Sequence, residues 1–147
     1  MRKTNLAILV VTIIVVTLLM SCDFFSDGTV YFYSMVNEDN SPSNYQLRYR
    51  NDGWIIKMTL GEVDEKGFDT KEKALSYVGK VTFTLTVDGE PIDPVGLITV
   101  EQHGDNRWHV VKPYRVTLNK GEYEVFGTTV IEEKGFSREN TVFLTIY

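Results

Sequence analysis

The chain has 147 residues, a formal net charge of −5 and a single cysteine. This length is enough for one domain with its own core. The acidic balance argues against nucleic-acid binding, which depends on neutralising phosphate groups. A lone cysteine excludes an intramolecular disulfide and a zinc site built from several thiolates.

The first 21 residues have the pattern of a secretory signal peptide. Arg2 and Lys3 precede an apolar run from Leu6 to Met20 that two threonines interrupt,. The run falls short of the roughly 20 apolar residues of a spanning helix, although an uncleaved membrane anchor is the alternative. Removal of residues 1–21 takes the net charge from −5 to −7. That balance argues against electrostatic docking on anionic lipid.

The run ends in Leu19-Met20-Ser21-Cys22. This segment resembles the lipobox of bacterial lipoproteins, in which an aliphatic residue, a tolerant position and a small residue precede cysteine. The resemblance implies that the Cys22 thiol is acylated and that Cys22 is the first mature residue. It also implies a lipid-anchored, extracytoplasmic protein in the cell membrane or the outer membrane. An ordinary packed cysteine is the alternative.

Residues 22–28 are expected to form a short lipidated tether. Strand-like sequence starts near Thr29, and at 3.3–3.6 Å per residue the tether spans at most about 25 Å. A single domain then occupies residues 29–147. Phe24 and Phe25 are expected either in the headgroup layer or against the domain itself.

An alternation of apolar and polar residues dominates this domain. Val81–Val87 and Trp54–Leu60 alternate as half-buried strands do,. Tyr45–Arg50, followed by Asn51-Asp52-Gly53 and Trp54, predicts a hairpin. Further strands are expected at Thr29–Val36, Leu97–Gln102, Arg107–Val111, Tyr114–Leu118, Glu122–Ile131 and Thr141–Tyr147. Turns are expected at Asp88-Gly89, Gly104-Asp105, Lys112-Pro113, Lys120-Gly121 and Lys134-Gly135. The spacing predicts an all-β sandwich of about seven to nine antiparallel strands.

One segment departs from this alternation. Asp69-Thr70-Lys71-Glu72 has the shape of a capping box, and Ala74, Leu75 and Val78 give a short apolar face before Gly79,. A short helix is expected here, with an irregular loop as the alternative.

Two stretches resemble those of bacterial immunoglobulin-like modules. Val81–Ile92 (VTFTLTVDGEPI) is similar to their opening strand and turn, and Leu118–Tyr123 (LNKGEY) to the turn before their penultimate strand. The resemblance covers residues 50–147 and implies that Tyr123 forms a tyrosine corner. Val125 stands where antibody domains have a disulfide cysteine, so a purely apolar core is implied.

No complete catalytic motif occurs in the sequence: phosphate-binding loops, dinucleotide fingerprints and nucleophile elbows are missing,. We therefore expect neither an enzyme nor a cofactor. His103, Asp105 and His109 are reasonable metal ligands by residue type. However, Gly104-Asp105 reads as a hairpin tip at which His103 faces Asn106, so the two rings are not expected to converge.

A second acidic group is a candidate calcium site by residue type. Glu62, Asp64 and Glu65 lie beside Lys66 without the spacing of a calcium loop, so a solvated surface is expected,. No metal site is predicted.

The last hairpin carries the candidate partner surface. If its alternate residues face the core, Phe126, Phe143 and Tyr147 lie on its outer face, where gathered aromatic residues are typical of partner sites. Coverage of that face by Thr29–Val36 is the alternative. Thr141–Tyr147 lacks proline and lysine, so an open edge for strand addition is also expected.

These features favour a non-catalytic immunoglobulin-like module, anchored through Cys22, that docks a protein partner in the bacterial cell envelope. The alternative is a small-ligand or carbohydrate-binding lipoprotein with Trp54, Trp108 or Tyr114 as an aromatic platform.

Overall fold

The computed structural model describes residues 27–61, 67–104 and 106–147. The expected signal peptide, Cys22, the tether up to residue 26, and Glu62, Asp64, Glu65 and Asp105 lie outside the described residues. The elements are β1 (Thr29–Tyr31), η1 (Phe32–Ser34), β2 (Ser43–Leu47), β3 (Trp54–Leu60), α2 (Lys71–Leu75), β4 (Val81–Val87), β5 (Glu90–Pro91), β6 (Thr99–Gln102), β7 (Trp108–Val116), β8 (Gly121–Ile131), η2 (Glu132–Lys134) and β9 (Phe136–Ile146).

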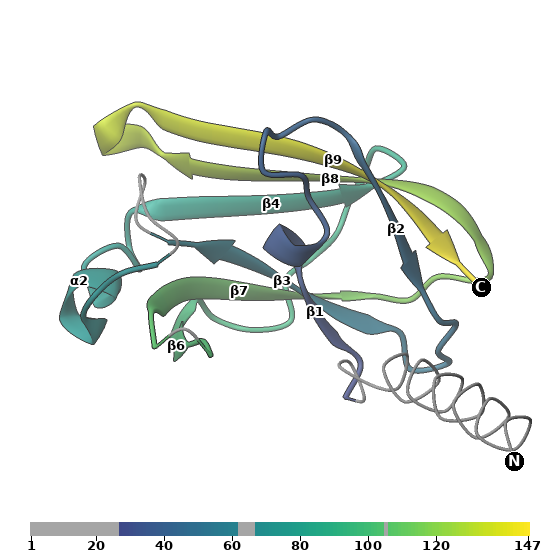
Figure 1. Ribbon diagram of the computed structural model, residues 1–147, viewed down its shortest axis with the longest axis horizontal. Coiled ribbons are helices and arrows are strands. Elements are labelled where there is room, and N and C mark those ends of the chain that lie inside the picture. The colour runs from purple at the N-terminus through teal and green to yellow at the C-terminus, as the bar shows by residue number, and fades with distance from the viewer. Residues whose placement is uncertain (1–26, 62–66, 105) are drawn as a thin grey trace, which may run out of the picture.

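Two sheets face each other (Figure 1). Sheet A has the order β1-β3-β7-β6, and sheet B has the order β2-β9-β8-β4-β5. The immunoglobulin arrangement places strands B, E and D in one sheet and C, F and G in the other. β3, β7 and β6 take the first three places, and β4, β8 and β9 the others. The predicted β-sandwich with one short helix is thus confirmed.

The first two strands depart from the expected antiparallel pairing. β1 pairs in parallel with β3, and β2 pairs in parallel with β9. The hairpin predicted between Tyr45–Arg50 and Trp54 is therefore wrong, because β2 and β3 belong to different sheets. The turn itself forms, with Gly53 at a φ of +73°, but it carries the chain from one sheet to the other. Both strands bury alternate residues against the common core. A chain that crosses from one sheet to the other buries these residues as well as a hairpin would.

The turn predicted at Lys112-Pro113 is also wrong. β7 runs through it without a break, and Pro113 lies opposite Lys57. A proline in a strand has no N–H to donate and needs a place where none is required. The Pro113 carbonyl accepts from Val95 N at 3.0 Å, on the side away from β3. The pairing of β6 with β7 ends at Val111, so the missing N–H faces a side where the regular ladder has stopped.

Alternation builds the core between the sheets. Trp54, Ile56, Met58 and Leu60 of β3 are buried, as are Val81, Phe83, Leu85 and Val87 of β4. A Cβ built on Gly127 of β8 would lie 2.6 Å from the ring of Phe32 in η1. The segment after β1 therefore turns inward and packs Phe32 between the sheets.

The predicted helix forms as α2. The Thr70 hydroxyl accepts from the backbone N–H of Lys73 at 3.2 Å and caps it,. Ala74 is fully buried, whereas Leu75 is half exposed. The expectation that Leu75 belongs to the apolar face is wrong, because a helix of five residues presents little more than one turn to the core.

Candidate functional site

The candidate partner residues lie on the outer face of sheet B. Val125, Val142 and Leu144 point into the core, and their neighbours point outward. Phe143 is 46% exposed and Tyr147 is 56% exposed, whereas Phe126 is half-buried. The structure thus leaves two of the three aromatic residues accessible.

A shallow hollow surrounds Phe143. In the strand register Phe143 lies between Asn44 of β2 and Glu124 of β8, while Thr145 lies opposite Glu122. The hollow has a volume of about 390 Å³, and its lining residues are Asn44, Glu122, Tyr123, Glu124, Phe143, Leu144 and Thr145. We call it the Phe143 hollow. An exposed ring with two carboxylates beside it is the main chemical feature of this face.

The carboxylates of the hollow are not neutralised within the described part of the chain. There, neither Glu122 nor Glu124 forms an ion pair with a lysine or arginine. A third carboxylate adjoins them, because Asp88 Oδ1 accepts from the backbone N–H of Glu124 at 2.8 Å. The hollow therefore combines an apolar ring with a local excess of negative charge.

Thr29–Val36 does not cover this face, so that alternative is wrong. Its strand β1 pairs with β3 in the opposite sheet, and Phe32 enters the core. β1 spans three residues rather than eight because the chain turns inward at Phe32. The outer face of sheet B stays accessible as a result.

The expected open edge at Thr141–Tyr147 is wrong as well. β2 pairs with β9 from Val142 to Ile146, and Tyr147 N–H donates to Leu47 O at 3.1 Å. β9 is therefore an inner strand over this length. Strand addition there is blocked, which leaves the face rather than the edge as the candidate surface.

The outer face of sheet A carries a cluster that the sequence analysis did not predict. His103 and His109 stack with ring centroids 4.1 Å apart and an interplanar angle of 15°. The prediction that these rings do not converge is wrong, because the strand register places His103 opposite Arg107, while Asn106 lies in the turn and donates its N–H to His103 O. This register places His103 diagonally across from His109 on one face. Tyr31 and Tyr33 lie 4.5 Å and 5.8 Å from the His103 ring.

An ion pair extends this tyrosine–histidine cluster. Lys57 Nζ lies 2.8 Å from Glu101 Oε2 and bridges from β3 to β6 across β7. The Tyr31 hydroxyl donates to the same carboxylate at 3.4 Å. Burial works to lower the pKa of Lys57, but the hydrogen bond and attraction of Glu101 outweigh it, so the pKa is raised. The cluster is internally bonded.

Within the described residues, the cluster contains no group of side chains placed to hold a metal ion. Residues 27–61, 67–104 and 106–147 contain no group of three or more histidine, cysteine, aspartate or glutamate side chains placed to hold an ion. Imidazoles that stack with nearly parallel planes also direct their nitrogen lone pairs side by side instead of toward one point.

The aromatic platform proposed for a carbohydrate is wrong for two of its three residues. Trp54 is 7% exposed and Tyr114 is 2% exposed. The Tyr114 hydroxyl donates to Phe83 O at 2.8 Å, and burial raises its pKa to about 12. Trp108 is half-buried, with Lys71 Nζ 5.5 Å from its ring centroid. Two of these rings are core residues, and of the three candidates only Trp108 is partly exposed.

Tyr123 makes the hydrogen bond typical of a tyrosine corner. Its hydroxyl donates to Asn119 O, four residues earlier, at 3.2 Å,. The ring also contacts the start of β8, where a Cβ at Gly121 would lie 3.6 Å from it. Tyr123 therefore holds the β7–β8 connection beside the Phe143 hollow.

Sequence reasoning missed the polar part of the hollow. The positions of Glu122 and Glu124 follow from the alternation of β8, so the sequence did contain a signal for them. Asn44 reaches Phe143 only through the parallel pairing of β2 with β9. That pairing joins segments about a hundred residues apart in the sequence and leaves no local signal.

No protein-family model matches the chain, and the search of curated proteins gave no match. Within the described part of the chain, no helix is both long enough and apolar enough to cross a membrane.

Proposed function

We propose that the protein is a lipid-anchored, non-catalytic module of the bacterial cell envelope that docks a protein partner in the Phe143 hollow. The single observation that carries the docking proposal is the half-exposed Phe143 ring, which lies opposite Glu124 in a hollow that Glu122 also lines. The lipobox-like segment ending at Cys22 supports the anchor. The lack of complete catalytic motifs in the sequence supports a binding role.

The chemistry of the hollow defines the partner segment. An apolar side chain of the partner buries the Phe143 ring, which releases ordered water from both surfaces. Lysine or arginine residues that flank this side chain neutralise Glu122 and Glu124, and such complementarity adds specificity and speeds association. We therefore propose a basic segment with an apolar anchor residue as the occupant.

The test is in-cell cross-linking followed by mass spectrometry on the wild-type protein, Cys22→Ala and Phe143→Ser. We expect one dominant envelope partner with the wild type and loss of that partner with Phe143→Ser. Cys22→Ala is expected to leave the membrane fraction and to lose the partner through displacement.

Each part of the proposal can fail separately. Retention of the mature Cys22→Ala chain in the membrane fraction would contradict the lipid anchor. An unchanged partner set with Phe143→Ser would contradict docking in the hollow. A thermal shift with soluble sugars would instead favour the ligand-binding alternative.

A further inference from the structure

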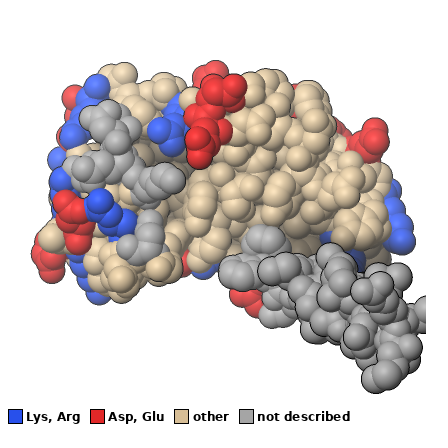
Figure 2. All heavy atoms as spheres, viewed as in Figure 1, with Lys and Arg blue, Asp and Glu red and all other residues tan. Residues whose placement is uncertain are grey.

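Arginine side chains gather at one end of the domain. This basal end comprises the start of β3, the end of β9 and the turn before Trp54, and it lies at the right in Figure 1. Arg48 and Arg50 precede the turn, and Arg115 lies opposite Ile55 on β7. Figure 2 shows Lys and Arg side chains at this end of the view.

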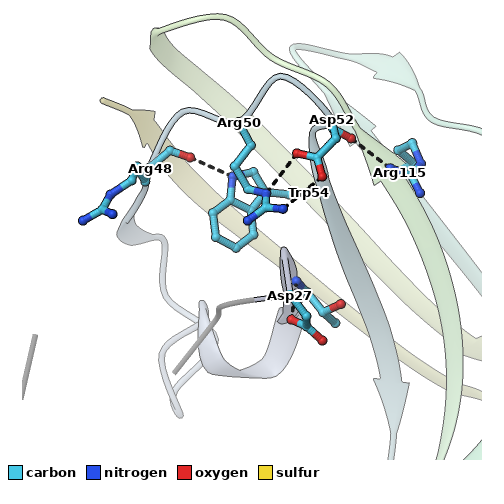
Figure 3. Close-up of polar contacts among 7 residues, drawn as sticks. Asp27, Arg48, Arg50, Asp52, Trp54 and Arg115 are labelled. Carbon is cyan, nitrogen blue, oxygen red and sulfur yellow. Dashed lines mark hydrogen bonds and ion pairs between the residues drawn. The ribbon is translucent and has the colours of Figure 1, made fainter. Parts of the chain in front are cut away.

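Asp52 contacts two of these arginine side chains. Arg50 Nη2 lies 2.9 Å from Asp52 Oδ2, and Arg115 Nη1 donates to the Asp52 carbonyl at 2.8 Å (Figure 3). The hydrogen bond from Arg50, with the attraction of both guanidinium groups, holds the pKa of Asp52 below its usual range. The Arg48 side chain points away from this group in Figure 3. It therefore offers a guanidinium to the surroundings.

The chain that precedes the domain leaves it at this end. Gly28 O accepts from Ile55 N–H at 2.7 Å, and a Cβ at Gly28 would lie 2.8 Å from Arg50 Nε. Gly28 lies six positions after Cys22, which is at most about 22 Å of extended chain. An acyl group on Cys22 thus keeps the basal end within reach of the lipid headgroups.

The other residues of this end fit an interface between water and lipid. Tyr49 and Tyr147 are exposed and adjacent, because Tyr49 N–H donates to Tyr147 O at 2.8 Å. Tyrosine is enriched at the headgroup level of membranes, and arginine can extend its guanidinium toward phosphate while its stem lies on apolar surface. Among the described residues, Asp27 and Asp52 are the carboxylates of the turn and the chain exit, and Glu122 of the Phe143 hollow lies beside the end of β9, opposite Thr145. The local balance is therefore more positive than the chain's net charge of −5.

We propose that the basal end docks on the phosphate headgroups of anionic phospholipid, with Arg48 and Arg115 as its principal contacts. The proposal rests on the lipid anchor at Cys22. Docking would stand the sandwich on the membrane and leave the outer face of sheet B directed sideways, open to a partner in the same envelope. It also modifies the expectation from net charge, which averages over the whole domain and misses a local cluster.

The two tryptophans lie at opposite ends of the domain, so their fluorescence can show which end approaches the membrane. Trp54 lies at the basal end, opposite Val116, and Trp108 lies at the other end of β7. Eight residues of strand separate these levels, or about 26 Å. In a Trp108→Phe variant, the fluorescence therefore reports on the basal end alone.

The experiment uses the full acylated protein, carrying Trp108→Phe, in vesicles that contain a lipid with a nitroxide headgroup. Phosphatidylcholine vesicles are compared with vesicles that also contain phosphatidylglycerol. We expect stronger quenching of Trp54 with phosphatidylglycerol, and loss of this excess in high salt and in Arg48→Gln/Arg115→Gln. The matched control Lys80→Gln/Arg138→Gln removes two cations from the opposite end and should keep the excess.

The outcomes separate the two proposals. Equal quenching in both vesicle types, with the protein still bound to them, would overturn basal docking and leave the anchor intact. Failure to sediment with either vesicle type would overturn both. A loss of the excess in the distal control as well would show a general effect of charge and would overturn the assignment to the basal end.

Discussion

On the outer face of sheet A, charged and aromatic side chains bond to one another; at the Phe143 hollow on sheet B, the carboxylates have no such partner among the described residues. Lys57 pairs with Glu101, Tyr31 donates to the same carboxylate, and His103 stacks on His109. On sheet B, Phe143 is half exposed, and Glu122 and Glu124 have no ion-pair partner among the described residues. Similar residue types thus stabilise the fold on one face and remain available for binding on the other.

Two adjacent valines show that the two outer faces also differ in burial. Val110 faces the core, and Val111 faces outward between Thr59 and Thr99. Both are 0% exposed. Sheet A is therefore buried on both sides at this level, whereas the outer face of sheet B is accessible at Phe143.

The core between the two sheets gives the largest predicted change in stability, and it serves as a reference for changes on the two outer faces. Burial raises the pKa of Tyr114 to about 12 in the folded chain, against about 10 in the unfolded chain. The contribution of the neutral, buried Tyr114 phenol to the free energy of unfolding is complete below pH 10 and is lost as the pH rises through 12. We expect the wild type to lose up to about 2.7 kcal/mol of unfolding free energy over that range beyond the loss in Tyr114→Phe. Urea unfolding at pH 8 and pH 12 measures the difference, and equal losses would contradict a buried, neutral phenol.

Valine truncation compares the faces directly. Val111→Ala on sheet A is expected to cost about 2 kcal/mol, because a fully buried side chain loses its contacts and leaves a cavity. Val110→Ala should cost a similar amount. Val130→Ala, the matched change on the outer face of sheet B, should cost less than about 1 kcal/mol because Val130 is only half-buried,. A cost for Val130→Ala equal to that for Val111→Ala would contradict the difference in burial between the two outer faces.

Neutralising one carboxylate on each face gives a smaller effect. Glu101→Gln leaves Lys57 without its partner and should cost about 1 kcal/mol, since the pair is partly buried,. Glu124→Gln should change stability by less than about 0.5 kcal/mol, as is usual for exposed positions. Denaturant midpoints measure both, and salt should reduce only the cost of Glu101→Gln.

Phe143 is expected to contribute little to stability but much to partner capture. Phe143→Ser removes a half-exposed ring and should shift the unfolding free energy by less than about 1 kcal/mol, while it abolishes partner capture. Thermal denaturation and capture are measured on the same preparation. A large loss of stability would mean that the ring is part of the fold rather than of a docking surface.

Local signals in the sequence predicted the elements well, but not their partners. The period-two pattern located β3, β4 and β8, and the glycine of the Asn51-Asp52-Gly53 turn indeed takes a positive φ. Turn chemistry does not determine which sheet receives the next strand, so the hairpin prediction failed. The strand breaker rule failed at Pro113 because the end of β6, a distant segment, determines whether its N–H is needed.

The same distinction explains the site. Alternation placed Phe143 and Tyr147 outward, and the exposed fractions agree. The stacking of His103 on His109 depended on a shift of one residue in the pairing of β6 with β7. A shift of that size decides which side chains share a face, and the composition of the turn did not determine it.

The most direct test of the account is photo-cross-linking in cells with p-benzoylphenylalanine at position 143. The same reagent at position 84, an exposed threonine on the outer face of sheet B in β4, serves as the control. The account predicts a cross-linked envelope protein from position 143, much less from position 84, and loss of the product when Glu122 and Glu124 are changed to lysine. No product from position 143, or equal products from both positions, would contradict docking in the Phe143 hollow.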